Sequence, residues 1–68
     1  MQTVSESYLL GIREGRDLLK TFAPSIEEMR ALAANCETLL KQGFARDMAD
    51  VFRGERDFWR NQIRKVQS

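Results

Sequence analysis

The sequence predicts an all-α protein in which three helices form one small bundle, with the third helix the longest and the chain dimerised. Two segments, Thr3–Glu6 and Ser25–Glu28, have the capping-box pattern, a hydroxyl residue followed three positions later by Glu. Pro24 and Gly43 stand where helices should end. Between these positions the apolar residues recur with the helical period, which predicts stripes that bury against one another.

The first helix is expected over about residues 4–23. The Thr3 hydroxyl would accept from the backbone N–H of Glu6 at its start. Pro24 ends it, because a proline disfavours helical geometry in the residue before it. The apolar stripe consists of Val4, Tyr8, Gly11, Ile12, Gly15, Leu18, Leu19 and Phe22.

The second helix is expected over 26–42, with Ser25 as its cap and Gly43 in the left-handed position that follows a helix. The third is expected over 45–66 and should be about 30 Å long. The connections are short, so consecutive helices should lie antiparallel. The far end of the third helix, from Trp59 to Val66, should overhang and keep apolar surface uncovered. In an alternative arrangement, this helix exchanges between two chains.

The small size of the chain is the reason to expect a dimer. A core of 68 residues typically supplies about 3–5 kcal/mol, and natural domains of this size add a disulfide, a metal or a second subunit. Cys36 is the only cysteine and there is no histidine, so neither a disulfide nor a zinc site is expected. Leu9 and Leu10, on the charged side of the first helix, indicate a further contact surface.

Gly11 and Gly15 lie one turn apart in the middle of the first apolar stripe. Each costs about 0.8–1 kcal/mol relative to Ala inside a helix, so a packing reason is expected. The pair would form a groove for a neighbouring helix or a bulky ring, within the monomer or across a dimer interface. The residues expected to pack between helices or chains are Gly11, Gly15, Phe52, Glu55, Trp59, Gln62 and Ile63.

Glu55 and Gln62 are polar residues near the centre of the third helix's apolar face. A carboxylate there is costly unless it is paired, and Tyr8, Arg13, Arg30 or a second chain could pair with it. Two interpretations remain open. The face stays partly hydrated, or the two side chains form a polar layer that sets the register between helices.

An arginine-rich face lies opposite the apolar side of the third helix, and Asp50 and Asp57 lie within it. A face of this kind could meet an acidic protein or nucleic acid. The two aspartates should pair with Arg46, Arg53 and Arg60 along the helix, which is typical of a solvated surface. The arginines of this face are Arg46, Arg53, Arg56, Arg60 and Arg64.

Catalysis is not expected, and neither is a cofactor or a metal. The chain has no histidine, no nucleophile elbow and no phosphate loop. Cys36 falls in the middle of an apolar stripe, as a small core residue would. No run approaches the roughly 18 apolar residues of a membrane span, no signal peptide is evident, and a lone reduced thiol suits the cytosol, so the cytoplasm is the expected location.

Three segments resemble the small all-helical accessory proteins of lambdoid phages and prophages, which are encoded between exonuclease and excisionase genes. They are MQTVSESY at 1–8, GIREGR at 11–16 and RGERDFW at 53–59. The resemblance implies a non-enzymatic protein of the bacterial host cytoplasm, either an adaptor directed at a bacterial host protein or a regulatory adaptor. The expected function is therefore protein–protein interaction as a homodimer. The alternatives are a nucleic-acid-binding regulator that uses the arginine face and a subunit of a phage assembly.

Overall fold

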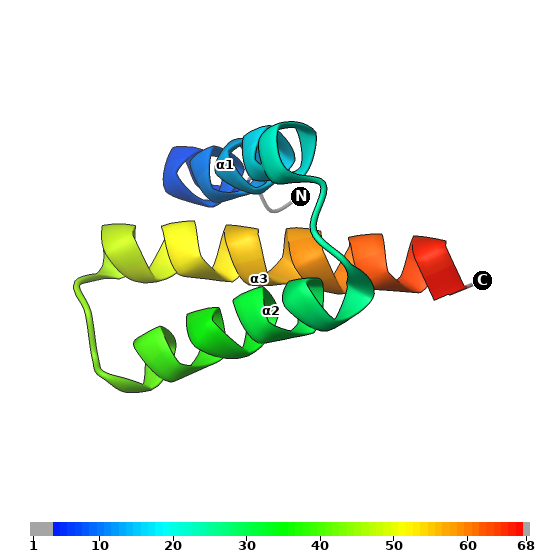
Figure 1. Ribbon diagram of the computed structural model, residues 1–68. Coiled ribbons are helices and arrows are strands. Elements are labelled where there is room, and N and C mark those ends of the chain that lie inside the picture. The colour runs from blue at the N-terminus through cyan, green and yellow to red at the C-terminus, as the bar shows by residue number, and fades with distance from the viewer. Residues whose placement is uncertain (1–3, 68) are drawn as a thin grey trace.

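The computed structural model describes residues 4–67, which form three α-helices and no strand. They are α1 (Glu6–Phe22), α2 (Ile26–Lys41) and α3 (Arg46–Gln67). α3 has 22 residues and is the longest, as the sequence predicts. Figure 1 shows α2 and α3 antiparallel and side by side, with α1 crossing α3 steeply. The predicted all-α class and number of helices are confirmed for this part of the chain.

α3 is the helix on which the other two pack. Both α1 and α2 make extensive helix–helix contacts with it, whereas the backbones of α1 and α2 do not come within packing distance of each other. The prediction that consecutive helices lie antiparallel holds for α2 and α3. For α1 it is wrong, because α1 packs across α3 instead of alongside α2 (Figure 1).

α1 begins two residues later than predicted, at Glu6. Ser5 has an extended backbone, and its hydroxyl accepts from the Tyr8 N–H at 3.1 Å, which makes Ser5 the N-cap. The same hydroxyl donates to Asp50 Oδ2 of α3 at 2.9 Å. The proposed cap Thr3 lies outside the described residues. A local capping pattern contains no information about contacts with another helix. The sequence therefore did not show that Ser5, and not Thr3, caps α1.

The other helix ends follow the sequence more closely. The capping box of α2 is complete, because Ser25 Oγ accepts from the Glu28 N–H at 3.2 Å and Glu28 Oε1 accepts from the Ser25 N–H at 3.0 Å. Gly43 has φ of 78° after the end of α2, as predicted. α1 ends with Ala23 in the left-handed region, at φ of 44°. Among residues 4–67, Ala23 is the only residue other than glycine that has a positive φ.

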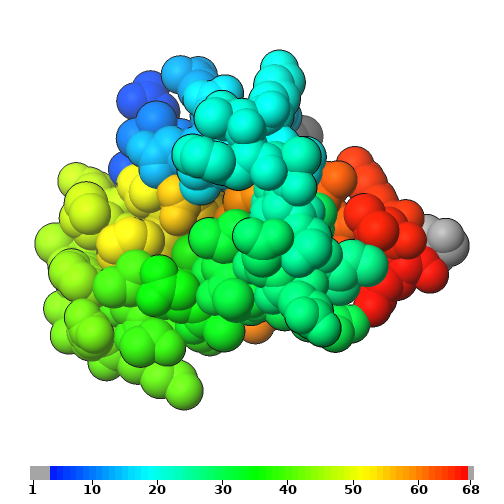
Figure 2. All heavy atoms as spheres, viewed as in Figure 1, coloured from blue at the N-terminus to red at the C-terminus, as the bar shows by residue number. Residues whose placement is uncertain are grey.

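The core lies between α2 and α3. It contains Met29 and Ala33 of α2 and Trp59 of α3, which is 1% exposed. The ring of Phe58 packs edge-on against Trp59, with centroids 5.0 Å apart. The apolar overhang expected from Trp59 onward is therefore wrong for Trp59. Only the last turns of α3 project beyond the other helices, and Val66 is exposed there (Figure 2).

Candidate functional site

The closest approach between helices is the α1–α3 crossing, which Gly11 and Gly54 make possible. A methyl group on Gly11 would overlap the Val51 carbonyl oxygen and lie 2.9 Å from the Glu55 nitrogen. A methyl group on Gly54 would overlap the Tyr8 carbonyl oxygen. Any side chain here meets backbone, so the helices would have to move apart.

Gly15 serves a different purpose, one turn along α1. A methyl group there would lie 2.6 Å from the Phe58 ring, a side chain rather than backbone. The predicted groove thus receives a helix at Gly11 and a ring at Gly15. Both glycines are buried against α3 of the same chain. Gly54 of α3 completes this contact from the opposite helix.

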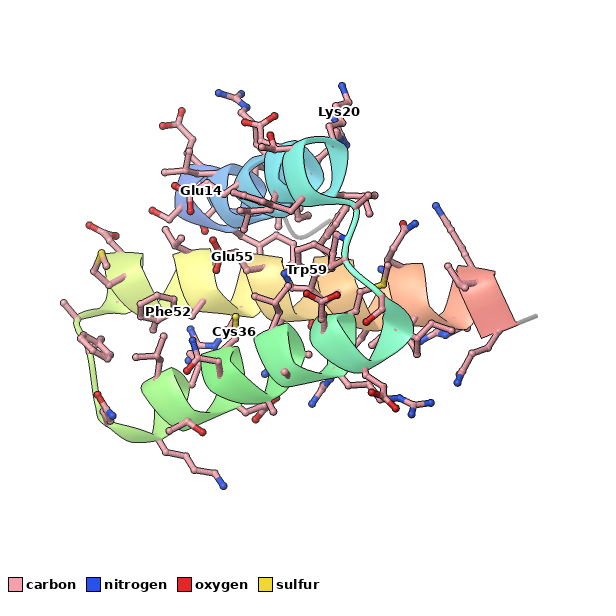
Figure 3. All side chains as sticks on the ribbon, viewed as in Figure 1. Glu14, Lys20, Cys36, Phe52, Glu55 and Trp59 are labelled. Atoms are coloured by element: carbon pink, nitrogen blue, oxygen red, sulfur yellow. The ribbon has the colours of Figure 1, made fainter. Side chains whose placement is uncertain are left out.

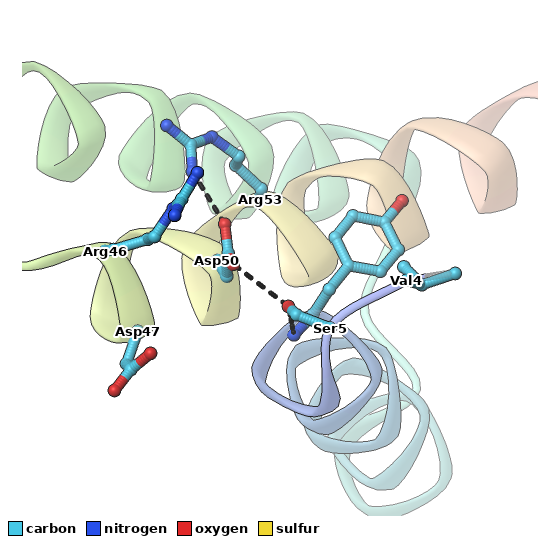
Figure 4. A pocket seen from close by; sticks show the side chains of 7 residues that line it. Val4, Ser5, Arg46, Asp47, Asp50 and Arg53 are labelled. Carbon is cyan, nitrogen blue, oxygen red and sulfur yellow. Dashed lines mark hydrogen bonds and ion pairs between the residues drawn. The ribbon is translucent and has the colours of Figure 1, made fainter. Parts of the chain in front are cut away.

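Two hydrogen bonds tie α1 to α3 beside this crossing. Tyr8 Oη donates to Asp57 Oδ2 at 2.5 Å, and Ser5 Oγ donates to Asp50 (Figure 4). The hydrogen bond to Asp57, aided by burial, raises the pKa of Tyr8. Hydrogen bonds from Ser5 and then Arg53 hold the pKa of Asp50 below its usual range. Both aspartates therefore connect helices instead of only neutralising arginines on their own helix.

Glu37 of α2 is the centre of the ion pairs between α2 and α3. Its Oε1 lies 3.3 Å from Arg56 Nη1 and 2.7 Å from Arg60 Nη2. Arg56 also pairs with Asp57, with Nε 3.0 Å from Oδ1. Burial disfavours the charged form of Arg56, but Asp57 and Glu37 outweigh it and raise its pKa.

The structure divides the predicted arginine face. The Arg53–Asp50 pair is present at 2.7 Å, as expected. The expected Arg60–Asp57 pair is wrong, because Arg60 turns to Glu37 of α2. Arg46 and Arg64 are exposed and make no salt bridge within residues 4–67. A continuous row of uncommitted arginines is therefore not present in the part described.

Glu55 lies at the junction of the three helices, between Glu14 of α1 and Cys36 of α2 (Figure 3). Cys36 Sγ donates to Glu55 Oε2 at 3.6 Å. Burial, followed by the hydrogen bond and charge of Glu14, raises the pKa of Glu55 to about 7. The arginine partners predicted for Glu55 are wrong, since Arg13 and Arg30 are exposed and the groups found against it are an acid and a thiol.

The remaining predicted packing residues are divided between the core and its edge. Ile63 packs against the core cluster, and Phe52 packs edge-on with Phe44 at a centroid distance of 5.3 Å. Gln62 is half-buried, and its side chain has no hydrogen bond among residues 4–67. The predicted polar layer thus contains Glu55 but not Gln62.

Phe22 is the apolar residue that the sequence places least well. It belongs to the predicted buried stripe of α1, yet as the last residue of this helix it is 71% exposed. Beside it lies a shallow, mainly apolar hollow of about 400 Å³ between α1 and α2. The hollow is lined by Leu18, Phe22, Pro24, Glu28, Ala31 and Leu32.

No group of three or more acidic, cysteine or histidine side chains within residues 4–67 is arranged to bind a metal ion. None of the three helices described is long and apolar enough to cross a membrane. No protein-family model, curated protein or solved structure matches the chain.

Proposed function

We propose that the protein is a non-enzymatic helical interaction protein that acts through protein–protein contacts, as a homodimer. The observation that carries the proposal is Phe22, a large aromatic side chain that is 71% exposed beside an apolar hollow. Among the described residues, Met29 and Trp59 are the only large apolar side chains that are buried. Hence the monomer leaves much of its apolar surface exposed to water.

The energetics of a small domain support this proposal. Burying a phenylalanine side chain contributes about 1.5–3 kcal/mol, which is a large fraction of the stability of a domain this size. A contact that covers Phe22 and the hollow would therefore add substantially to folding. Large apolar side chains are also exposed elsewhere in the described part of the chain, at Val4, Leu9, Leu10, Phe44, Met48 and Val66.

A bacterial host protein as the further partner, and the bacterial cytoplasm as the place of action, belong to the same proposal. They are supported by the resemblance of residues 1–8, 11–16 and 53–59 to the phage accessory proteins.

Nucleic-acid binding through α3 is the alternative, and the ion pairs give it less support. Arg53, Arg56 and Arg60 are engaged by carboxylates of the chain itself, so phosphate contacts would have to replace those pairs. Measuring the affinity for duplex DNA at increasing salt concentration tests whether α3 binds nucleic acid. Each phosphate contact contributes a log–log slope of roughly −0.9, and we expect weak binding that is lost near physiological salt. Tight binding that survives there would establish the alternative.

Light scattering at micromolar concentration tests the homodimer. The wild-type chain should give about twice its mass of 7.9 kDa, and its melting temperature should rise with concentration. Phe22→Ala should give the monomer mass with unchanged helix content. Met48→Ala, which removes another exposed apolar side chain, is the matched control and should remain a dimer. A wild-type monomer at every concentration would refute the homodimer.

Capture of partners from a bacterial lysate tests the wider interaction. The wild-type protein should retain a protein that Phe22→Ala does not retain, while Met48→Ala still does. Equal capture by both variants would show that the surface around Phe22 is not the binding surface.

A further inference from the structure

The carboxyl group of Glu55 has an unusual set of neighbours. Glu14, an exposed acid of α1, lies beside it, and Cys36 of α2 donates to it at 3.6 Å. Glu55 is half-buried on α3, so groups from all three helices meet at this one side chain (Figure 3). The titratable groups that face it are an acid and a neutral thiol. The next residue, Arg56, is engaged with Glu37 and Asp57.

The chemistry of this pair requires a proton. Ionised carboxylates are acceptors only, so Glu14 and Glu55 can hydrogen-bond to each other only when one of them is protonated. Without that proton, two like charges would face each other in a partly desolvated place. Burial and the nearby Glu14 together raise the pKa of Glu55 to about 7. The thiol does not titrate in the same range, since burial raises the pKa of Cys36 to about 11.

We propose that the Glu14–Glu55 carboxyl pair is a proton-dependent latch between α1 and α3, closed while the pair shares one proton and loosened when that proton is lost. The pair lies close to the point where α1 and α3 cross. The Glu55 backbone nitrogen lies against Gly11 at the helix crossing, so repulsion would act where α1 and α3 are closest. α1 packs on α3 and not on the α2 backbone, and away from the crossing it is held by the Ser5 and Tyr8 hydrogen bonds to α3 and by Leu18 and Leu19 against the core. This device does not depend on the dimer.

The pH at which the latch acts follows from the direction of the shift. The pKa of Glu55 is higher in the folded protein than the ordinary value of 4.5. The stability that the pair contributes is therefore fully present below that ordinary value and is lost as pH rises through about 7. Tm should fall between roughly pH 5.5 and pH 8.5, although most domains are at or near maximal stability in this range.

A titration of the glutamate carboxyl carbons by NMR tests the pair directly in the wild-type protein. The Glu55 signal should titrate with a midpoint near 7, and Glu14→Gln should lower that midpoint. Asp17→Asn is the matched control, because Asp17 is an exposed acid of the same helix. It should leave the midpoint unchanged. A wild-type midpoint at the usual glutamate value would overturn the proposal.

Thermal unfolding tests the consequence for α1. Glu55→Gln places an amide donor beside Glu14 that cannot lose a proton. The Tm of this variant should therefore not fall between roughly pH 5.5 and pH 8.5. Asp17→Asn should retain the wild-type fall. The scans are repeated at two protein concentrations, so that dissociation of a dimer is separated from the effect of pH. If Glu55→Gln and wild type lose Tm equally, the pair is not the latch.

Discussion

Gly11 of α1 lies directly against Gly54 of α3 where the two helices cross: a methyl group on Gly54 would be 3.2 Å from the Gly11 Cα and would overlap the Tyr8 carbonyl oxygen. Two helices can approach each other more closely at a pair of glycines than at residues that carry side chains. This contact explains why α1 crosses α3 steeply and does not lie in a bundle with α2. It also places Tyr8 and Glu55 within reach of the opposite helix.

Gly11→Ala should destabilise the protein although alanine favours helices. The propensity gain is about 1 kcal/mol, whereas overpacking against backbone typically costs about 1–3 kcal/mol and occasionally more. We expect a net loss of up to about 2 kcal/mol, measured by urea denaturation, and a similar loss for Gly54→Ala.

Gly15→Ala is the matched comparison, because its new methyl group meets the Phe58 ring, which can turn. Its loss should be clearly smaller than that of Gly11→Ala. Gly15→Leu, with a longer side chain, should lose about 1–3 kcal/mol. If Gly11→Ala melts above wild type, the close crossing does not exist.

Tyr8 should ionise above its ordinary pKa of 10, because its hydroxyl donates to Asp57. The pKa is raised in the folded protein, so the stability this hydrogen bond contributes is present below the unfolded value and lost as pH rises through the folded one. Tyr8 is the only tyrosine, so absorbance titration reports it alone. Asp57→Asn should return the midpoint toward 10. An unchanged midpoint in Asp57→Asn would exclude the hydrogen bond as the cause.

Glu37→Gln should weaken two contacts to α3 together, because both Arg56 and Arg60 pair with Glu37 Oε1. The pairs are partly exposed, so the expected loss is no more than about 1 kcal/mol and should shrink at high salt. A double-mutant cycle with Arg60→Gln measures the coupling. Glu27→Gln, an exposed acid of the same helix, is the control. No coupling between Glu37 and Arg60 would contradict the ion pair.

Ala23→Gly should stabilise the protein. Ala23 has φ of 44°, a left-handed conformation that costs a residue with a side chain roughly 1–2 kcal/mol. The greater freedom of glycine in the unfolded chain offsets about 0.5–1 kcal/mol of this, which leaves a gain of up to about 1.5 kcal/mol. Thermal unfolding measures it. Ala34→Gly, at an exposed position inside α2, should have the opposite effect. A loss at both positions would contradict the left-handed cap.

The sequence by itself determined the three helices and most of their ends. The Ser25–Glu28 capping box, Pro24 and the left-handed Gly43 act within a few residues, so their effect is visible in the local pattern. It also determined that Gly11 and Gly15 must be packed and that Cys36 is buried, because each occupies the middle of an apolar stripe.

Only the tertiary structure decided which helix meets which, and with which partners. Four features depend on contacts between residues that are distant in sequence. They are the crossing at Gly54, the capping of α1 by Ser5 and not Thr3, the exposure of Phe22 and the contact of Arg60 with Glu37. The surroundings of Glu55 depend most on tertiary contacts, because its neighbours come from the two other helices. A helical period shows which face is buried, but the angle at which two faces cross is set by close packing between them.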